Sequence, residues 1–186
     1  MSIEALEHRV RFMGLGPASE SYRSIGPLLQ ASLPTALDLF YDQVRAEPET
    51  RRFFKDEAHI GAAHTAQQGH WRAIIEGRTD EEYANSVRTI GRVHARIGLE
   101  PRWYIGGYAL VLDGLVKAVV KDHEEKRSRF SKSDGGKALG ETLGAVIKAA
   151  LLDMDFVISI YLAEADKARH EAELVRAEAE AVQKRV

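Results

Sequence analysis

The segment from Thr79 to Tyr108, TDEEYANSVRTIGRVHARIGLEPRWYIGGY, constrains the fold more than any other part of the chain. Its apolar residues recur at helical spacing, and His94 takes one place in that series, between Ile90 and Ile97. We therefore expect an amphipathic helix with one inward-facing histidine. Such a histidine is either a satisfied core residue or a metal ligand, and its spacing alone leaves both interpretations open.

The ends of this helix are marked by local chemistry. Thr79 and Glu82 have the spacing of a capping box, and Gly98 suits a left-handed C-cap. Pro101 fits the first turn of a following helix, because proline lacks the backbone N–H that is unpaired there. The sequence thus predicts a sharp corner about one turn after His94.

Composition limits the class of protein. A chain of 186 residues can bury one good-sized core and leave an extension, and a net charge of −2 with interleaved acids and bases gives no reason to expect a nucleic-acid partner. The absence of cysteine excludes disulfides and thiolate ligands. The charged N-terminus lacks the apolar core of a signal peptide, and no run of about 18 apolar residues occurs. We expect a cytoplasmic protein without a membrane span.

The rest of the chain also has helical periodicity, and no alternating run bounded by hairpin turns predicts a strand. The expected fold class is all-α. Pro34 should restart or bend a helix, Asp56 should cap the next one, and Tyr41 should face inward, where a core tyrosine is the simplest interpretation. The expected helices span about residues 1–15, 25–33, 33–47, 57–76, 79–98 and 103–126, and a loop at 127–137 precedes a second long helix.

That second long helix carries an apolar stripe from Leu139 to Leu162 that is too wide for one neighbour. We expect it to be buried both inside the domain and against a second subunit. From Ala163 onward Ala, Glu, Lys and Arg dominate, which is typical of an exposed or coiled-coil-like helix. A chain that stops in such a helix is expected to be a domain of a longer protein.

Three segments carry a resemblance to a known family: YDQVRAEP, HWRAIIEGRTDEEY and IGRVHARIGLEPRWYIGGY. Together they resemble the globin domain of the globin-coupled sensors, which include heme-based aerotaxis transducers and globin-linked diguanylate cyclases and histidine kinases. The similarity covers most of residues 5–165. It implies a globin fold with an extra N-terminal helix, dimerising through a four-helix bundle of the last two long helices.

The same resemblance implies heme b as cofactor, with His94 as the proximal iron ligand. Tyr41 matches the distal tyrosine that donates a hydrogen bond to bound O2, and Tyr104 matches a tyrosine near the proximal histidine. The other residues that it places at the cofactor are Phe54, Ala63, Ala66 and Ile97. Aerotaxis transducers have a distal threonine where this chain has Ala66, and a bulkier aliphatic residue where it has Ala63. His59 and His64 are further candidates for distal groups.

By this resemblance residues 1–165 are a sensor globin domain, and residues 166–186 are a helical linker towards an output module beyond Val186. The implied function is an O2 sensor, with CO and NO as further ligands, that signals through a homodimer and is not itself an enzyme. One alternative is a heme-free globin-fold scaffold of the stressosome type. Another is a heme enzyme such as a nitric-oxide dioxygenase, but the chain has no Gly-rich flavin- or nicotinamide-binding turn.

Overall fold

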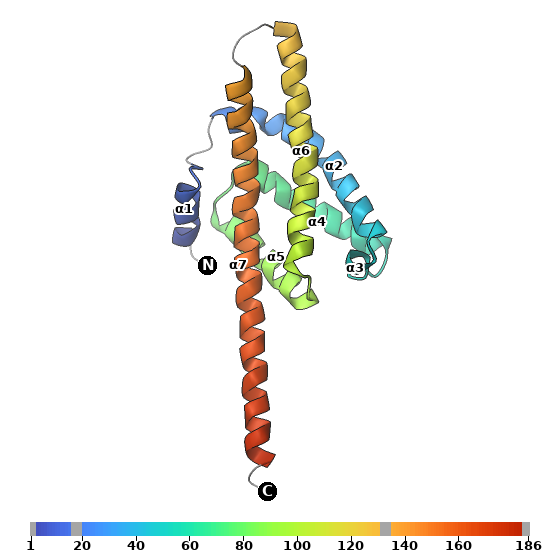
Figure 1. Ribbon diagram of the computed structural model, residues 1–186, viewed down its shortest axis with the longest axis vertical. Helices are drawn as coiled ribbons and strands as arrows, with labels where there is room; N and C mark the ends of the chain where they lie inside the picture. Colours follow the sequence, from blue (N-terminus) through green and yellow to red (C-terminus); the bar gives the residue numbers. More distant parts are fainter. Residues whose placement is uncertain (1–2, 16–19, 131–134, 184–186) are drawn as a thin grey trace.

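The computed structural model describes residues 3–15, 20–130 and 135–183, and all regular elements in these ranges are α-helices (Figure 1). The predicted all-α class is therefore confirmed. The helices are α1 (Ile3–Phe12), α2 (Glu20–Ala46), α3 (Pro48–Arg51), α4 (Glu57–Ile75), α5 (Glu81–Ile97), α6 (Pro101–Phe130) and α7 (Gly135–Gln183).

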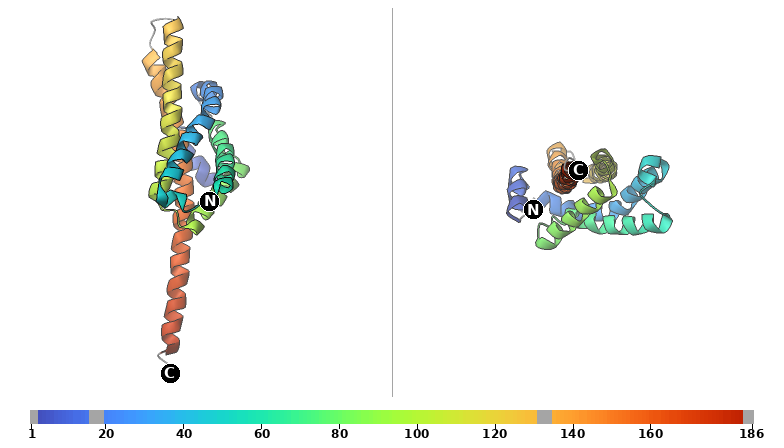
Figure 2. Two further views of the ribbon diagram at one scale, coloured as in Figure 1. Left: turned by 90° about the vertical axis from the view of Figure 1, so that its right-hand side faces the viewer. Right: turned by 90° about the horizontal axis from the view of Figure 1, so that it is seen from below.

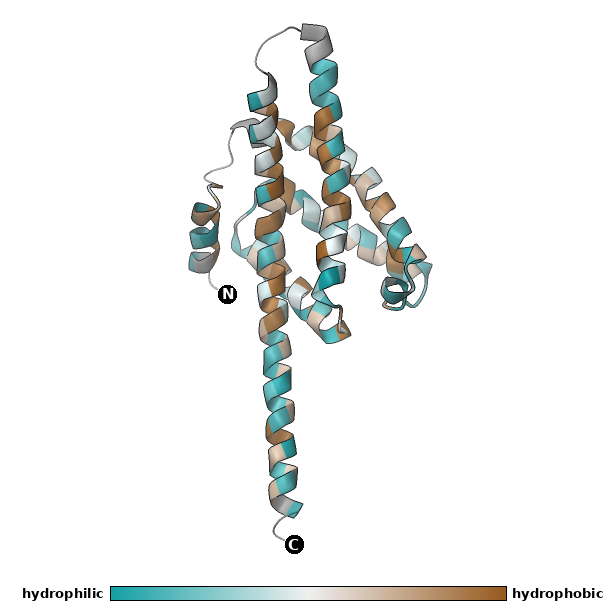
Figure 3. Cartoon of the chain, viewed as in Figure 1, coloured by the Kyte–Doolittle hydropathy of each residue, from teal (hydrophilic) through white to brown (hydrophobic). Residues whose placement is uncertain are grey.

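The two longest helices, α6 and α7, run antiparallel side by side and form one layer of the molecule (Figures 1 and 2). Helices α2, α4 and α5 pack on one face of this layer, with α2 against α6 and α5 against α7. Helix α1 lies along the flank of α7, and the C-terminal part of α7 extends beyond all other helices. Figure 3 shows that this extension is mainly hydrophilic, as the composition from Ala163 onward predicts.

The core lies between the α6–α7 layer and the helices packed on it. Leu6 of α1 is completely buried, so this short helix belongs to the core rather than to an arm. Apolar side chains at helical spacing on each long helix supply the rest, and burying each one contributes about 1.5–3 kcal/mol. The largest fully buried side chains include Leu33, Leu37, Ile60, Trp71, Val111, Leu115 and Phe156.

Helix α2 differs from its prediction. It continues from Glu20 to Ala46 through both Pro27 and Pro34, so the predicted restart at Pro34 does not occur. A proline inside a helix removes one hydrogen bond, but Leu29, Leu33 and other buried residues on either side of Pro34 hold both halves on the same core. Packing therefore outweighs the local break signal.

The boundaries of α5 are partly as predicted. The C-cap is Gly98, with a left-handed φ of 69°, and α6 begins at Pro101, so the predicted corner is confirmed. The predicted Thr79 cap is wrong: Asp80 is the N-cap, and its carboxylate accepts from the backbone N–H of Tyr83 at 2.8 Å. Glu82 pairs with Arg78 instead of closing a capping box.

The connection between α6 and α7 is shorter than the predicted loop at 127–137, because α6 continues to Phe130 and α7 begins at Gly135. Residues 131–134 of that loop lie outside the described residues. Helix α6 is also more apolar than the sequence analysis allowed. By length and composition, Pro101–Lys126 could cross a membrane, with a mean hydropathy of 1.3 over its most apolar window, of which 22% is buried.

Candidate functional site

His94 lies in the last turn of α5, where its imidazole is mostly buried. Its Nδ1 is 2.8 Å from the carbonyl oxygen of Ile90, one turn earlier. Because a carbonyl can only accept, Nδ1 carries the proton and Nε2 keeps a free lone pair. Burial lowers the pKa of the imidazole, which favours this neutral form. The helix thus presents His94 in the form that binds a metal ion.

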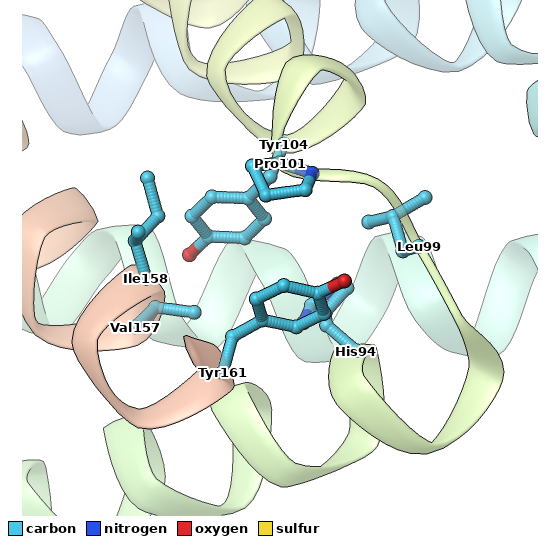
Figure 4. A pocket seen from close by; sticks show the side chains of 7 residues that line it. All are labelled: His94, Leu99, Pro101, Tyr104, Val157, Ile158 and Tyr161. Atoms are coloured by element: carbon cyan, nitrogen blue, oxygen red, sulfur yellow. The ribbon is translucent and has the colours of Figure 1, made fainter. Parts of the chain in front are cut away.

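A small cavity lies beside His94, between the α5–α6 corner and α7 (Figure 4). Gly98 and Pro101 create the corner, and α7 closes the opposite side. The Tyr104 ring meets the imidazole edge-on, with ring centres 5.0 Å apart and an interplanar angle of 67°. The other lining residues are Leu99, Val157, Ile158 and Tyr161.

The position of Tyr104 agrees with its expected place near His94, but its hydrogen bond goes elsewhere. Its hydroxyl donates to the hydroxyl of Tyr108 at 3.0 Å, while His94 is satisfied by Ile90. Burial raises the pKa of Tyr104, so the phenol stays protonated. Tyr104 therefore contacts His94 through its ring.

Tyr41 belongs to a second apolar cluster, separate from the main core. This cluster joins the C-terminal half of α2 to α4, and its fully or partly buried members are Phe40, Tyr41, Val44, Phe54, Ile60 and Ala63. Tyr41 is only 4% exposed, and its hydroxyl has no hydrogen-bond partner among the described residues. Burial raises its pKa, which keeps the phenol as a donor.

Three expected site residues, Tyr41, Phe54 and Ala63, are thus brought together by the structure. A polar ligand that entered this cluster would meet the Tyr41 hydroxyl as a hydrogen-bond donor.

The two candidate distal histidines differ in their contacts. His64 on α4 lies against Tyr41, with ring centres 5.3 Å apart, and its Nε2 is 3.1 Å from a carboxylate oxygen of Asp38. His59 sits in the exposed first turn of α4 and accepts a hydrogen bond from the backbone of Lys55. His64 is therefore the one that borders the Tyr41 cluster.

Ala66 and Ile97 lie apart from both groups of residues described above. Ala66 is exposed on α4, and Ile97 in the last turn of α5 is 41% exposed. The predicted burial of Ile97 is wrong, because the apolar stripe of α5 is covered only as far as Ile90 and His94.

The structure also contains a buried polar cluster that the sequence analysis missed. Asp153, in the middle of α7, is completely buried and accepts hydrogen bonds from Tyr83, Tyr108 and His70. His70, on α4, is also buried. A sequence signal for Asp153 exists, since it occupies a buried-face position between Ala150 and Val157.

The residues around His94 and Tyr41 fit heme. Heme iron takes four ligands from the porphyrin and needs only one imidazole from the protein, which His94 can supply in the correct tautomer. Within the described ranges no three His, Cys, Asp or Glu residues gather in a way that could hold a bare metal ion. The Tyr41 hydroxyl supplies one donor beside an apolar cluster that His64 borders.

Comparisons with known proteins agree with this description. Residues 3–167 match the model of the Protoglobin family. The heme-based aerotactic transducer HemAT of Halobacterium salinarum is 23% identical over 137 residues, which are 73% of this chain and 28% of that protein. The chain therefore spans less than a third of the length of that relative.

Solved structures of similar fold include the globin domain of a globin-coupled sensor from Geobacter sulfurreducens, with a TM-score of 0.68 and 19% identity over 83% of this chain and 96% of that one. The ferric globin domain of E. coli DosC has a TM-score of 0.65 and 18% identity, over 81% of this chain and 97% of that one. The predicted globin fold is confirmed by these similarities.

Proposed function

This chain belongs to the protoglobin family, and from that premise we propose that it binds heme b through His94 and senses a diatomic gas, O2 above all. The observation that carries the proposal is the state of His94. It is neutral, its Nδ1–H is held by Ile90, and its Nε2 lone pair is free. The similarity to a heme-based aerotactic transducer supports the same function.

Bound heme would supply an iron with one open coordination position for a gas molecule. His94 provides the protein ligand, and its bond to the Ile90 carbonyl fixes the tautomer and makes the imidazole a stronger donor. The Tyr104 ring packs against the imidazole and limits its rotation. Leu99, Val157 and Ile158 give this side of the cavity an apolar lining.

Tyr41 is proposed to select the gas. O2 becomes partly negative when it binds and accepts a hydrogen bond, whereas CO is less polar and gains less from a donor. The Tyr41 phenol stays protonated and lies beside the apolar side chains of Phe54 and Ala63. One such bond in an apolar site contributes about 1–3 kcal/mol, or about one to two decades in affinity. Ala66 and Ile97 are proposed as residues at the edge of the cofactor.

We further propose that two chains form a homodimer in the cytoplasm through α6 and α7. Both helices carry exposed large apolar residues, which supports a four-helix contact. They are Ile105 and Leu110 on α6 and Ile147 and Leu151 on α7. Residues 1–165 would act as the sensor, and residues 166–186 would carry the signal to an output module.

The test of heme binding is the absorption spectrum of the protein mixed with hemin. We expect a Soret band for the unchanged chain and for His170→Ala, a control on the exposed end of α7, and its loss or displacement in His94→Ala. If His94→Ala kept the same spectrum and affinity, the ligand would be a different residue. A chain that binds no hemin would instead support the heme-free scaffold.

The test of gas selection is the dissociation rate of O2 and CO from the reduced protein. Tyr41→Phe should speed O2 release by about 10- to 100-fold and change CO release much less, because only O2 loses a strong hydrogen bond. Tyr161→Phe, which removes a hydroxyl on the His94 side, should leave the ratio of the two rates unchanged. Equal changes for both gases in Tyr41→Phe would refute the donor role.

A further inference from the structure

A chain of hydrogen bonds leads from the ring beside His94 to the middle of α7. The Tyr104 hydroxyl donates to Tyr108 at 3.0 Å, and the Tyr108 hydroxyl donates to Oδ2 of Asp153. Tyr108 is 4% exposed and Asp153 is fully buried. The path therefore runs from the partly buried Tyr104 into the protein interior.

Asp153 also binds two other helices. The Tyr83 hydroxyl of α5 donates to Oδ1 at 2.5 Å, and Nε2 of His70 on α4 is 2.9 Å from Oδ2. Two phenol hydroxyls donate to this carboxyl group, and the His70 ring nitrogen makes a third polar contact with it. Four helices thus meet at one carboxyl group.

This arrangement is not what stability alone favours. A buried carboxyl group loses its hydration, and well-packed apolar residues in place of the group and all of its polar partners often give an equal or more stable fold. Val146, Ala150 and Val157 are buried on the same face of α7 as Asp153. An acidic residue among them is better explained by the geometry that it imposes on its partners.

The two oxygens of Asp153 serve different partners. Oδ2 accepts from Tyr108, whose oxygen is then left to accept the proton of Tyr104, so both hydroxyls have a fixed direction. This sets the plane of the Tyr104 ring against His94. Oδ1 accepts from Tyr83, whose ring stacks on His70 rather than on Tyr104.

We propose that Asp153 acts through Tyr108 and Tyr104 to position His94. The same hydrogen bonds carry a displacement of His94 to α7. The positioning role belongs to the chain itself. The displacement rests on the proposed function, because it requires a ligand bound at a heme held by His94.

The test compares two matched variants, Tyr108→Phe and Tyr83→Phe. Each parent tyrosine is 4% exposed, and each substitution removes one hydroxyl from Asp153 while keeping the aromatic ring. Only Tyr108→Phe breaks the hydrogen bonds that join Asp153 to Tyr104. Tyr104→Phe cuts the same path at its other end and replaces Tyr108→Phe if that variant fails to fold.

The first readout is the nitrogen NMR spectrum of the His94 ring in the heme-free protein. In the unchanged chain and in Tyr83→Phe we expect one tautomer, protonated at Nδ1. In Tyr108→Phe we expect shifted nitrogen resonances and loss of the slowly exchanging Nδ1 proton. Unchanged resonances in Tyr108→Phe, or equal changes in both variants, would overturn the positioning role.

The second readout is the distance between spin labels on α5 and α7 of one hemin-loaded, reduced chain, with and without CO. The chain has no cysteine, so Asn85→Cys and Glu173→Cys, both at exposed positions, give two defined labels. An excess of unlabelled protein keeps the measured distances within one chain. We expect a CO-dependent change in the unchanged and Tyr83→Phe backgrounds and its loss in Tyr108→Phe.

The outcomes separate the two proposals. A chain that takes up no hemin refutes the proposed function, while the NMR readout still decides the positioning role. If the hemin-loaded chain has the same distance between its labels with and without CO, no displacement is transmitted to α7. If the distance changes equally in every variant, the displacement does not travel through Tyr108. Either result overturns the proposed transmission.

Discussion

Gly91 marks the closest approach of α5 to α7, and replacing it with alanine tests the packing next to His94. A Cβ atom at position 91 would lie 2.7 Å from Cγ2 and 2.8 Å from Cβ of Ile160, and 3.1 Å from the carbonyl oxygen of Val157. These distances are shorter than van der Waals contact, and one of them involves backbone. Gly91→Ala must therefore push the two helices apart.

The expected magnitude follows from two opposing effects. Inserting a methyl group into a packed contact costs about 1–3 kcal/mol. Alanine in place of glycine inside a helix returns about 1 kcal/mol. Gly91→Ala should thus lower the free energy of unfolding by about 0–2 kcal/mol. Gly69→Ala is the matched control, because Gly69 is exposed within α4 and a Cβ there would meet nothing within 4 Å.

The assay is thermal unfolding of the heme-free protein, checked by urea unfolding. For a chain of this length, 1 kcal/mol corresponds to about 2–4 °C in the melting temperature. Gly69→Ala should raise it by a few degrees at most, and Gly91→Ala should fall below that control by about 2–12 °C. If both variants gained the same stability, α5 and α7 would not be in contact at Gly91.

The remaining predictions use the same comparison of a buried and an exposed group. Asp153→Leu leaves its three buried polar partners without the carboxyl group and should lower the free energy of unfolding in urea by about 3–5 kcal/mol. Asp166→Leu, on the exposed part of α7, should change this free energy by less than about 0.5 kcal/mol. Similar values for the two variants would refute the buried role of Asp153. A raised tyrosine pKa means that the folded state holds the proton more tightly, so stability present below about pH 10 is lost as the pH rises further. Tyrosinate absorbance should therefore show that three tyrosines ionise only as the protein unfolds: Tyr41, Tyr104 and Tyr108. Their ionisation in the folded state would contradict their burial. Leu151→Lys should shift the proposed dimer to monomer in light scattering, and Leu39→Lys on α2 should not; an unchanged dimer would exclude this face.

Local signals predicted the elements around the candidate site well. Asp56 caps α4, Gly98 ends α5 and Pro101 starts α6, each because the residue itself satisfies or avoids a backbone hydrogen bond. Asp80 displaced Thr79 as the cap of α5 because both neighbours can serve, and only the folded backbone selects one. The sequence therefore predicts the position of such a cap only to within one residue.

The features that depend on distant partners were not predictable in this way. Pro34 lies inside a continuous helix because the core holds both of its sides, and no local rule contains that core. His70 and Asp153 are 83 residues apart in the chain, yet their side chains meet at 2.9 Å. The apolar neighbours of Asp153 in the sequence are a sign of a buried acid. Its three partners come from three different helices, so the sequence does not identify them.

The neighbourhood of His94 is joined to α7 by two independent contacts of different character. Gly91, three residues before His94, packs against Val157 and Ile160, and this contact resists compression because glycine leaves no free space. The hydroxyls of Tyr104 and Tyr108 reach Asp153, and this contact resists separation because its donors are buried. Both end within residues 153–160 of α7. A displacement of His94 in either direction would therefore act on the same two turns of the helix that continues towards the C-terminus.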